Sequence, residues 1–246
     1  MRSNLYQECF EQETYYWWHT AKNKLVKDLI KRFIRKKSLK ILDLGCGTGG
    51  VLTALKSLGL IYGLDKTNQA LTKAKSRGIK NLTRHNLDNL PLPFKKNQFD
   101  LILTLDVLEH LRNPETTIID IKRILKPSGY LIITVPAYKY LFSYWDKMVG
   151  HKTRYSQKGV TRLVRKTGFK VKFSSYFHLI IFIPAVIVRL FKAKTARKYT
   201  SDFIPVPKVL NSFLILISRI ESKIIKLAPL PFGLSIILIA KNGKTK

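Results

Sequence analysis

Acidic residues are scarce in this chain, which has 15 Asp and Glu against 45 Lys and Arg in 246 residues. The formal net charge of +30 favours polyanionic partners such as nucleic acid, anionic lipid headgroups or phosphorylated substrates. An AT-rich genome would raise the lysine count without any such partner, so the charge alone does not select among these classes. The excess is uneven, because residues 147–246 hold 21 Lys and Arg but only Asp202 and Glu221.

Cysteines and long apolar runs are scarce as well. The two cysteines, Cys9 and Cys46, show neither a C-x-x-C nor a zinc-ligand spacing, so we expect no disulfide framework. No apolar run reaches the roughly 18 residues of a transmembrane helix; the longest, at 176–188, is interrupted by His178 and Pro184. The N-terminus lacks the apolar segment of a signal peptide. We therefore expect a cytoplasmic protein that could also lie on the inner face of the membrane.

Short apolar runs alternate with helical patterns along most of the chain. The continuous apolar run at 99–105 is typical of a strand buried on both faces of a parallel sheet. Helical spacing appears at 68–76, 113–125 and 157–167, and the last two of these helices end at proline or glycine. This alternation predicts an α/β protein with a doubly wound, Rossmann-like parallel sheet.

The composition divides the chain into four parts. Residues 1–37 are an aromatic segment followed by a basic helix at 21–37, and residues 38–175 are the core of the sheet. Residues 176–232 are an apolar and basic helical insertion, which precedes the last strand and tail at 233–246. Within the insertion, one apolar stripe on a helix at 208–226 predicts either packing on the domain or contact with an anionic membrane. The aromatic block 15–18 either packs in the core or covers a ligand.

A glycine-rich turn at 45–50 follows the strand at 40–44 and opens a helix. Glycine is needed where the backbone takes positive φ or approaches a ligand closely. Asp65 ends the next strand 20 residues after Gly45, where a carboxylate can accept both ribose hydroxyls of a nucleoside. The glycine spacing also fits an NAD oxidoreductase. Asp43 disfavours that alternative, because a carboxylate two residues before the turn would repel a pyrophosphate.

Residues 43–49, with the sequence D-L-G-C-G-T-G, resemble the first motif of class I S-adenosylmethionine-dependent methyltransferases. The resemblance continues through the ribose motif at 62–65 and the adenine loop at 86–88, where Asn86 replaces the usual Asp, and then through 99–111 and 125–131. It implies a seven-stranded Rossmann-like sheet that binds S-adenosylmethionine. The flanking segments are similar to a bacterial subgroup without an assigned acceptor, so the resemblance leaves the substrate open.

The resemblance also implies where the cofactor is bound. The backbone of Gly45 and Gly47 would approach its methionine part, Asp43 its ammonium group and Asp65 its ribose. The adenine would meet the loop at 86–87, and the carbonyl at the end of the strand 99–105 would lie near the sulfonium. The predicted cofactor residues are Asp43, Gly45, Cys46, Gly47, Asp65, Lys66, Asn86, Leu87 and Leu105.

Few side chains are candidates for the acceptor side, because the chain has five histidines. His110 follows the strand at 99–105, and His151 lies in the stretch 150–156, where similar enzymes commonly meet their acceptor. Imidazole titrates near neutral pH and suits a general base. Tyr155 and Arg154 could position an anionic acceptor there. The predicted catalytic residues are therefore His151, His110 and Tyr155, and the other three histidines are treated as background.

The stretch Asp106-Val107-Leu108-Glu109-His110 is similar to the E-x-x-E-H metal site of some ubiquinone O-methyltransferases and small-RNA methyltransferases. Carboxylate and imidazole groups at this spacing share a helical face and suit a divalent ion. Here Asp106 replaces the first Glu, and we expect no metal.

These observations predict an S-adenosylmethionine-dependent methyltransferase that acts on a small-molecule or lipid-linked acceptor, in the cytoplasm or at the membrane surface. The positive charge keeps an RNA methyltransferase as the alternative, although the chain shows neither a separate RNA-binding module nor an Asn-Pro-Pro-Tyr motif. A non-catalytic relative that binds the cofactor is a further alternative. The acceptor atom and the oligomeric state are not specified by the sequence.

Overall fold

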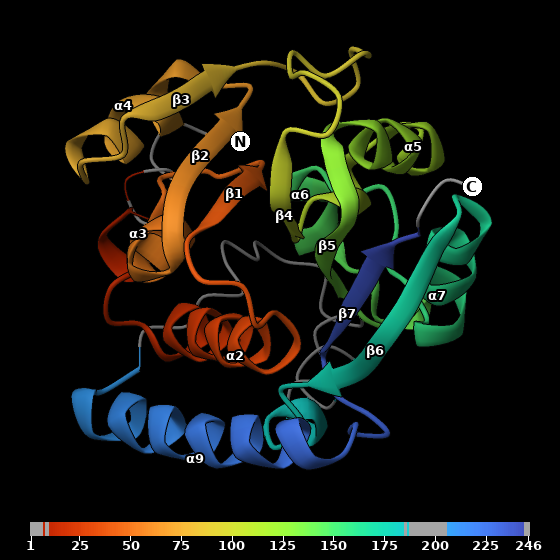
Figure 1. Ribbon diagram of the computed structural model, residues 1–246. Coiled ribbons are helices and arrows are strands. Elements are labelled where there is room, and N and C mark those ends of the chain that lie inside the picture. The colour runs from red at the N-terminus through yellow and green to blue at the C-terminus, as the bar shows by residue number, and fades with distance from the viewer. Residues whose placement is uncertain (1–6, 8–9, 185, 187–205, 244–246) are drawn as a thin grey trace.

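The computed structural model describes residue 7, residues 10–184, residue 186 and residues 206–243. Seven strands form one sheet in the order β3-β2-β1-β4-β5-β7-β6, with helices packed around it (Figure 1). The predicted seven-stranded α/β sheet is therefore confirmed. The strands are β1 Leu39–Leu44, β2 Gly59–Asp65, β3 Asn81–Arg84, β4 Phe99–Leu105, β5 Leu125–Pro136, β6 Phe169–Phe177 and β7 Ser235–Asn242.

The helices follow the predicted pattern with shifted ends. The predicted basic helix at 21–37 begins and ends earlier, so Trp17 and Trp18 of the aromatic block are its first residues. A short helix before residue 150 was not expected from the sequence. The helices are α2 Trp17–Phe33, α3 Gly50–Leu55, α4 Asn68–Ser76, α5 Pro114–Ile124, α6 Tyr144–Val149, α7 Gln157–Lys166 and α9 Lys208–Leu227, with 3-10 turns η1 Lys56–Leu58, η2 Leu108–His110 and η3 Lys139–Leu141.

The last strand corrects the expectation of a parallel sheet. β7 lies between β5 and β6 and runs antiparallel to both, whereas the pairs β1–β2, β2–β3, β1–β4 and β4–β5 are parallel. Almost every residue of β7 is buried, as its apolar run predicts. An apolar run shows that a strand is covered on both faces but carries no information about its direction, which is why the sequence did not show the reversal.

The centre of the sheet positions the site. β1 pairs with β2 on one side and with β4 on the other, so the order of the strands along the chain reverses between β1 and β4. In open α/β sheets, ligands bind outside the carboxyl ends of the strands at such a switch point. The glycine-rich turn follows β1, and turn η2 follows β4. These two segments therefore meet at the position that the topology favours for a ligand.

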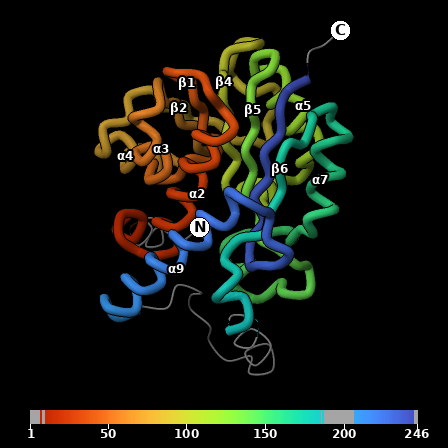
Figure 2. Tube along the Cα trace, turned by 60° about the horizontal axis from the view of Figure 1, so that its bottom comes forward, coloured from red at the N-terminus to blue at the C-terminus, as the bar shows by residue number. Residues whose placement is uncertain are grey.

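The helix α9 lies beside α2 in both views (Figures 1 and 2). The N–H of Trp17 donates to Asn211 Oδ1 at 2.9 Å, and the Ser222 hydroxyl donates to Asp28 at 3.1 Å. Buried Glu221 accepts the backbone N–H groups of His178 and Leu179 at 2.6 and 2.9 Å. This polar set attaches α9 to α2 and to the end of β6.

The amphipathic character predicted for 208–226 is confirmed, but most of the predicted apolar stripe does not face the domain. Val209, Phe213 and Ile224 are 84%, 56% and 46% exposed, and the buried residues of α9 are Glu221, Ser222 and Ile225. Much of the segment before α9, including its basic loop, lies outside the described residues. Among the residues described, no helix is both long enough and apolar enough to cross a bilayer.

Candidate active site

The glycine-rich turn is held against β2 and opens onto free space at one residue. The N–H groups of Gly45 and Cys46 both donate to the carbonyl of Leu64, at 2.7 and 2.9 Å. Gly47 and Gly49 have φ of +53° and +83°, which a side chain disfavours. A Cβ at Gly49 would lie 2.5 Å from Ile79 Cδ1, whereas a Cβ at Gly47 would meet nothing within 4 Å. Gly47 is thus the glycine at which a ligand can approach the backbone.

Replacing each of these two glycines by alanine should separate folding from binding. Both variants should lose about 1–2 kcal/mol of stability from the left-handed backbone, and Gly49→Ala should lose about 1–3 kcal/mol more from crowding Ile79. Gly47→Ala should instead weaken S-adenosylhomocysteine binding at least tenfold, because its methyl group enters the ligand space. Urea unfolding and calorimetry measure the two effects. If Gly47→Ala binds S-adenosylhomocysteine with the wild-type affinity, the ligand does not lie against this turn.

Asp65 is placed where the ribose contact is predicted. Its Oδ2 accepts the N–H of Gly47 at 3.0 Å, and its Oδ1 accepts both the N–H and the hydroxyl of Thr67 at 3.0 Å. The carboxylate therefore links the end of β2 to the glycine turn. A carboxylate has about four acceptor positions, so one side chain can hold the turn and still accept a ligand hydroxyl.

For Asp65→Ala we expect cofactor binding to weaken by about 1–3 kcal/mol, because charge-assisted hydrogen bonds are lost. The same change also frees the N–H of Gly47, which loosens the turn. Glu115→Ala on the exposed surface of α5 is the matched control and should bind normally. Calorimetry with S-adenosylhomocysteine measures the difference. If Asp65→Ala and Glu115→Ala bind equally well, the ribose is bound elsewhere.

A cavity of about 100 Å³ lies between the glycine turn and the N-terminal segment. Burial, with further repulsion from Glu13 and Asp65, raises the pKa of Asp43 to about 8, although Lys22 acts in the opposite direction. An uncompensated buried carboxyl of this kind suits a cationic ligand group such as an ammonium. The cavity is lined by Glu13, His19, Lys22, Asn23, Asp43, Gly45, Cys46, Gly47, Val51 and Leu105.

The N-terminal segment supplies site residues that the sequence argument missed. Glu13 accepts the Thr48 hydroxyl and the Gly50 N–H, the latter at 3.0 Å, so it contacts the start of α3. Lys22 Nζ lies 2.6 Å from Asp106 Oδ2 and joins the cavity wall to the segment after β4. His19, treated as background, lines the cavity. Acidic residues are rare in this chain, so the presence of Glu13 near the N-terminus was the signal that could have identified it as a site residue.

The remaining predicted cofactor residues lie outside this cavity. Leu87 is buried and Asn86 is exposed, with its Oδ1 accepting the N–H of Asp88 at 3.1 Å. Asn86 lines a second cavity of about 170 Å³ that also includes Arg112, and Lys66 is exposed. The structure therefore brings together Asp43, Gly45, Cys46, Gly47 and Leu105, with Asp65 behind the turn, and leaves the adenine contact as a prediction.

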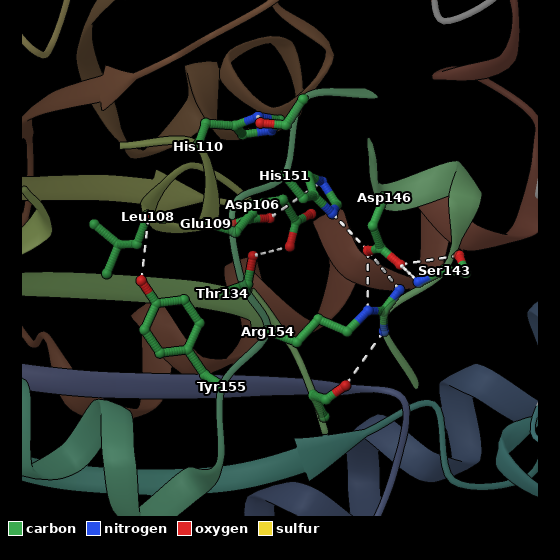
Figure 3. Close-up of polar contacts among 12 residues, drawn as sticks. Asp106, Leu108, Glu109, His110, Thr134, Ser143, Asp146, His151, Arg154 and Tyr155 are labelled. Carbon is green, nitrogen blue, oxygen red and sulfur yellow. Dashed lines mark hydrogen bonds and ion pairs between the residues drawn. The ribbon is translucent and has the colours of Figure 1, made fainter. Parts of the chain in front are cut away.

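The acceptor side centres on a buried carboxylate (Figure 3). Asp146 Oδ1 lies 2.7 Å from His151 Nδ1 and accepts Arg154 Nε at 2.9 Å, while Oδ2 accepts the Ser143 N–H at 2.8 Å. Burial opposes its ionisation, but hydrogen bonding from His151 and the charge of Arg154 hold the pKa of Asp146 well below its usual range. Because Asp146 accepts, Nδ1 of His151 carries a proton, so in the neutral imidazole the lone pair is on Nε2.

His110 and Glu109 face the same loop. His110 Nδ1 lies 3.1 Å from the carbonyl of Gly150, and the imidazole centroids of His110 and His151 are 4.7 Å apart. Burial and the neighbouring His151 lower the pKa of His110 to about 4. Glu109 is fully buried, and both its oxygens lack a hydrogen-bond partner from any other described residue. Burial, with repulsion from Asp106, raises the pKa of Glu109 well above its usual range.

Tyr155 reaches the same turn, whereas Arg154 does not face an acceptor. The Tyr155 hydroxyl donates to the Leu108 carbonyl at 3.2 Å, and burial together with Glu109 raises the pKa of Tyr155 to about 12. Arg154 is buried and donates to the Ala137 carbonyl at 3.2 Å as well as to Asp146. The expectation that Arg154 positions an acceptor is therefore corrected, because its guanidinium holds the loop that carries His151.

Comparison with known proteins agrees with this geometry. Residues 35–170 match a family model described as a methyltransferase domain. This match spans more than half of the chain, which therefore belongs to the methyltransferase family. The family and its fold use S-adenosylmethionine as the methyl donor, and the open space at Gly47 and the buried carboxyl of Asp43 fit that cofactor. The alternative of an NAD oxidoreductase is set aside.

The individual relatives are distant. An uncharacterised protein of Methanocaldococcus jannaschii is 40% identical over 107 residues, which are 44% of this chain and 45% of that protein. A ubiquinone biosynthesis O-methyltransferase of Maricaulis maris is 34% identical over 101 residues, 39% of this chain and 40% of that enzyme. The match thus spans less than half of each of these relatives. A methyltransferase in complex with the Haloferax volcanii Trm112 activator has a TM-score of 0.66 at 20% identity, covering 99% of this chain and 96% of that one, and shares the fold.

Proposed function

We propose that this methyltransferase transfers the methyl group of S-adenosylmethionine to a small-molecule or lipid-linked acceptor that binds beside His151. The observation that carries the proposal is the meeting of two clusters at the ends of β1 and β4. The glycine cavity lies on one side, and the Asp146–His151 pair with His110 lies on the other. The ion pair between Lys22 and Asp106 connects them. The O-methyltransferase activity named for the Maricaulis maris relative supports a small-molecule acceptor.

In this proposal, different residues bind the cofactor and activate the acceptor. Asp43 and the backbone at Gly47 hold the methionine part of the cofactor, and Asp65 holds its ribose. Methyl transfer is an in-line displacement, so alignment of acceptor and donor contributes much of the rate. His151 presents its Nε2 lone pair to the acceptor, with Asp146 fixing the tautomer, which is the arrangement by which a buried carboxylate orients a reactive imidazole.

The test is methyl transfer from labelled S-adenosylmethionine into a lipid-plus-soluble extract of the source cells. We expect label in a small-molecule or lipid fraction and at least a tenfold loss with His151→Ala, while His85→Ala behaves as wild type. Label in the RNA fraction, lost at high salt, would favour the RNA methyltransferase and contradict the proposal. Binding of S-adenosylhomocysteine with no label in any fraction would favour the non-catalytic relative.

We also propose that the enzyme works at an anionic membrane surface. The exposed apolar residues of α9 are flanked by the exposed cations Lys208, Arg219 and Lys223, and an apolar helix face with cations binds anionic bilayers. The exposed apolar residues of α9 are Val209, Leu210, Phe213, Leu216, Ile220, Ile224 and Leu227.

Liposome flotation tests the membrane proposal. The protein should float with vesicles that contain anionic phospholipid at low salt and should not float with zwitterionic vesicles. Phe213→Asp should abolish flotation, whereas Ile119→Asp, at a residue of α5 that is similarly exposed, should not. Absence of binding to anionic vesicles at low salt would disprove membrane association and leave the methyl-transfer proposal untouched.

A further inference from the structure

Three potential ligand side chains converge on the acceptor side of the candidate site. Glu109 and His110 come from turn η2 after β4, and His151 comes from the loop after α6. Each offers one ligand atom, and these three atoms all lie within 4.8 Å of one another. The separation of His151 Nε2 from Glu109 Oε1 is 3.8 Å. We propose that Glu109, His110 and His151 bind one divalent transition-metal ion, such as Zn²⁺.

The three ligand atoms lie near one another but would have to move closer to hold such an ion. Zinc binds imidazole nitrogen and carboxylate oxygen at about 2.0–2.2 Å, so tetrahedral ligand atoms lie about 3.3 Å from one another. The observed spacings are wider, 3.8 Å between His151 Nε2 and Glu109 Oε1 and up to 4.8 Å within the set. Turn η2 and the loop at 150–151 already contact each other through His110 and the Gly150 carbonyl. Rotation of the three side chains can therefore bring the ligand atoms together with little movement of the backbone.

The second ring nitrogen of each histidine is already engaged as metal sites require. His110 Nδ1 contacts the carbonyl of Gly150, and His151 Nδ1 contacts the carboxylate of Asp146 (Figure 3). Both partners accept, so both Nδ1 atoms carry protons, and in the neutral imidazoles the lone pairs are on the Nε2 atoms. Histidines that ligate a metal almost always donate their other N–H to a carbonyl or carboxylate in this way, which fixes the ring and its tautomer.

The buried carboxylate of Glu109 is an independent observation that points to a ligand. Its side chain is fully buried, and neither oxygen has a hydrogen-bond partner from another described residue. Burying a carboxylate without a partner is costly unless a cation or donors compensate it. The neighbouring Asp106 differs, because Lys22 and Thr134 hold its two oxygens at 2.6 and 2.9 Å. Asp106 is therefore outside the proposed ligand set.

This proposal departs from the expectation that no metal is bound. The sequence stretch 106–110 placed Asp106, Glu109 and His110 on one face, whereas the structure exchanges Asp106 for His151 from a loop distant in sequence. Two imidazoles and one carboxylate are a ligand set used by zinc hydrolases and by non-haem iron enzymes, with coordination positions left open. The inference rests on the proposed function in placing the acceptor here. With the ion bound, the Nε2 lone pair of His151 would hold the metal and not contact the acceptor, and the ion itself would lower the pKa of an acceptor hydroxyl.

Cobalt provides a direct readout, because Co²⁺ occupies such sites and its visible absorption reports the ligands. The full chain, freed of metal with a chelator, should bind one Co²⁺ with a visible band that Zn²⁺ removes by competition. Glu109→Gln and His151→Ala should each weaken Co²⁺ binding at least tenfold, and Asp146→Asn about 10–100-fold through the orientation of His151. His85→Ala, outside the cluster, is the matched control and should bind as wild type.

The outcomes separate this inference from the proposed function. Absence of a Co²⁺ band, or a band equally strong in wild type and Glu109→Gln, would overturn the metal site. S-adenosylhomocysteine affinity checks that each variant keeps its fold. Specific Co²⁺ binding without methyl transfer to any fraction would uphold the site and contradict the proposed function. Methyl transfer that persists in the presence of a chelator, together with no binding of Co²⁺, would overturn the metal site and uphold the proposed function.

Discussion

Replacing Asp146 with alanine is expected to lower the free energy of unfolding by about 3–5 kcal/mol, the range for removing one partner of a buried ion pair. The carboxylate is fully buried and pairs with Arg154, whose own side chain is 5% exposed. Without it, the guanidinium would be left buried without its carboxylate partner, and the Ser143 N–H at the start of α6 would lose its acceptor. Urea unfolding followed by circular dichroism measures the change.

A half-exposed ion pair supplies the control for Asp146→Ala. Glu115 of α5 pairs with Lys166 of α7 at 2.9 Å, and their side chains are 36% and 67% exposed. Solvent screens these charges, so Glu115→Ala should lose about 1 kcal/mol or less. Asp146→Asn preserves the shape and one acceptor oxygen, so it should fall between the two alanine variants. If Asp146→Ala were no more harmful than Glu115→Ala, the buried network around His151 would not hold the loop, and Asp146 would have no positioning role.

Asp43→Asn is expected to stabilise the protein without ligand by an amount that grows by about 4 kcal/mol between pH 5 and pH 8. Burial raises the pKa of Asp43 to about 8, against about 3.9 in an unfolded chain. Over this interval the unfolded state releases the proton while the folded state retains it, so wild-type stability falls as the pH rises. The asparagine variant has no proton to release and does not share the decline.

The same variant should bind the cofactor more weakly, because its side chain offers no charge to an ammonium group. A site carboxylate that destabilises the empty protein and is compensated by a cationic ligand is a typical exchange of stability for function. Urea unfolding of both proteins at several pH values tests the first effect. Asp120→Asn is the control. Hydrogen bonds from Arg123 and Leu92 lower the pKa of Asp120, so the contribution of Asp120 to the free energy of unfolding changes only at acid pH. A pH-independent difference between Asp43→Asn and wild type would contradict the burial argument.

The cofactor half of the site was largely predictable because its residues are close in sequence. A strand, a glycine turn and a helix form one continuous segment, and the carboxylate of Asp65 ends the neighbouring strand with which that segment pairs. Local spacing therefore carries the geometry. The antiparallel direction of β7 was not predictable, because a strand buried on both faces has the same apolar pattern in either direction.

The acceptor half was only partly predictable. His110 was identified as a candidate from its place after the strand at 99–105, and His151 and Tyr155 from a stretch where similar enzymes commonly meet their acceptor. Nothing in the local pattern connects His151 to Asp146 or to Glu109. Arg154 was expected to position an anionic acceptor, and the structure instead buries it against Asp146. Glu13 and Lys22 reach the cavity only because α2 and the segment before it lie over the glycine turn.

The sequence by itself determined the α/β class of fold and the cofactor turn, since these depend on periodicity and on contiguous motifs, while the seven strands were implied by the resemblance to a known family. Tertiary structure alone decided which charges are buried, which histidine nitrogens keep a lone pair and which face of α9 remains exposed. These properties arise from contacts between segments far apart in the chain, and burial, which sets the energies of charged groups, exists only after those segments have packed together.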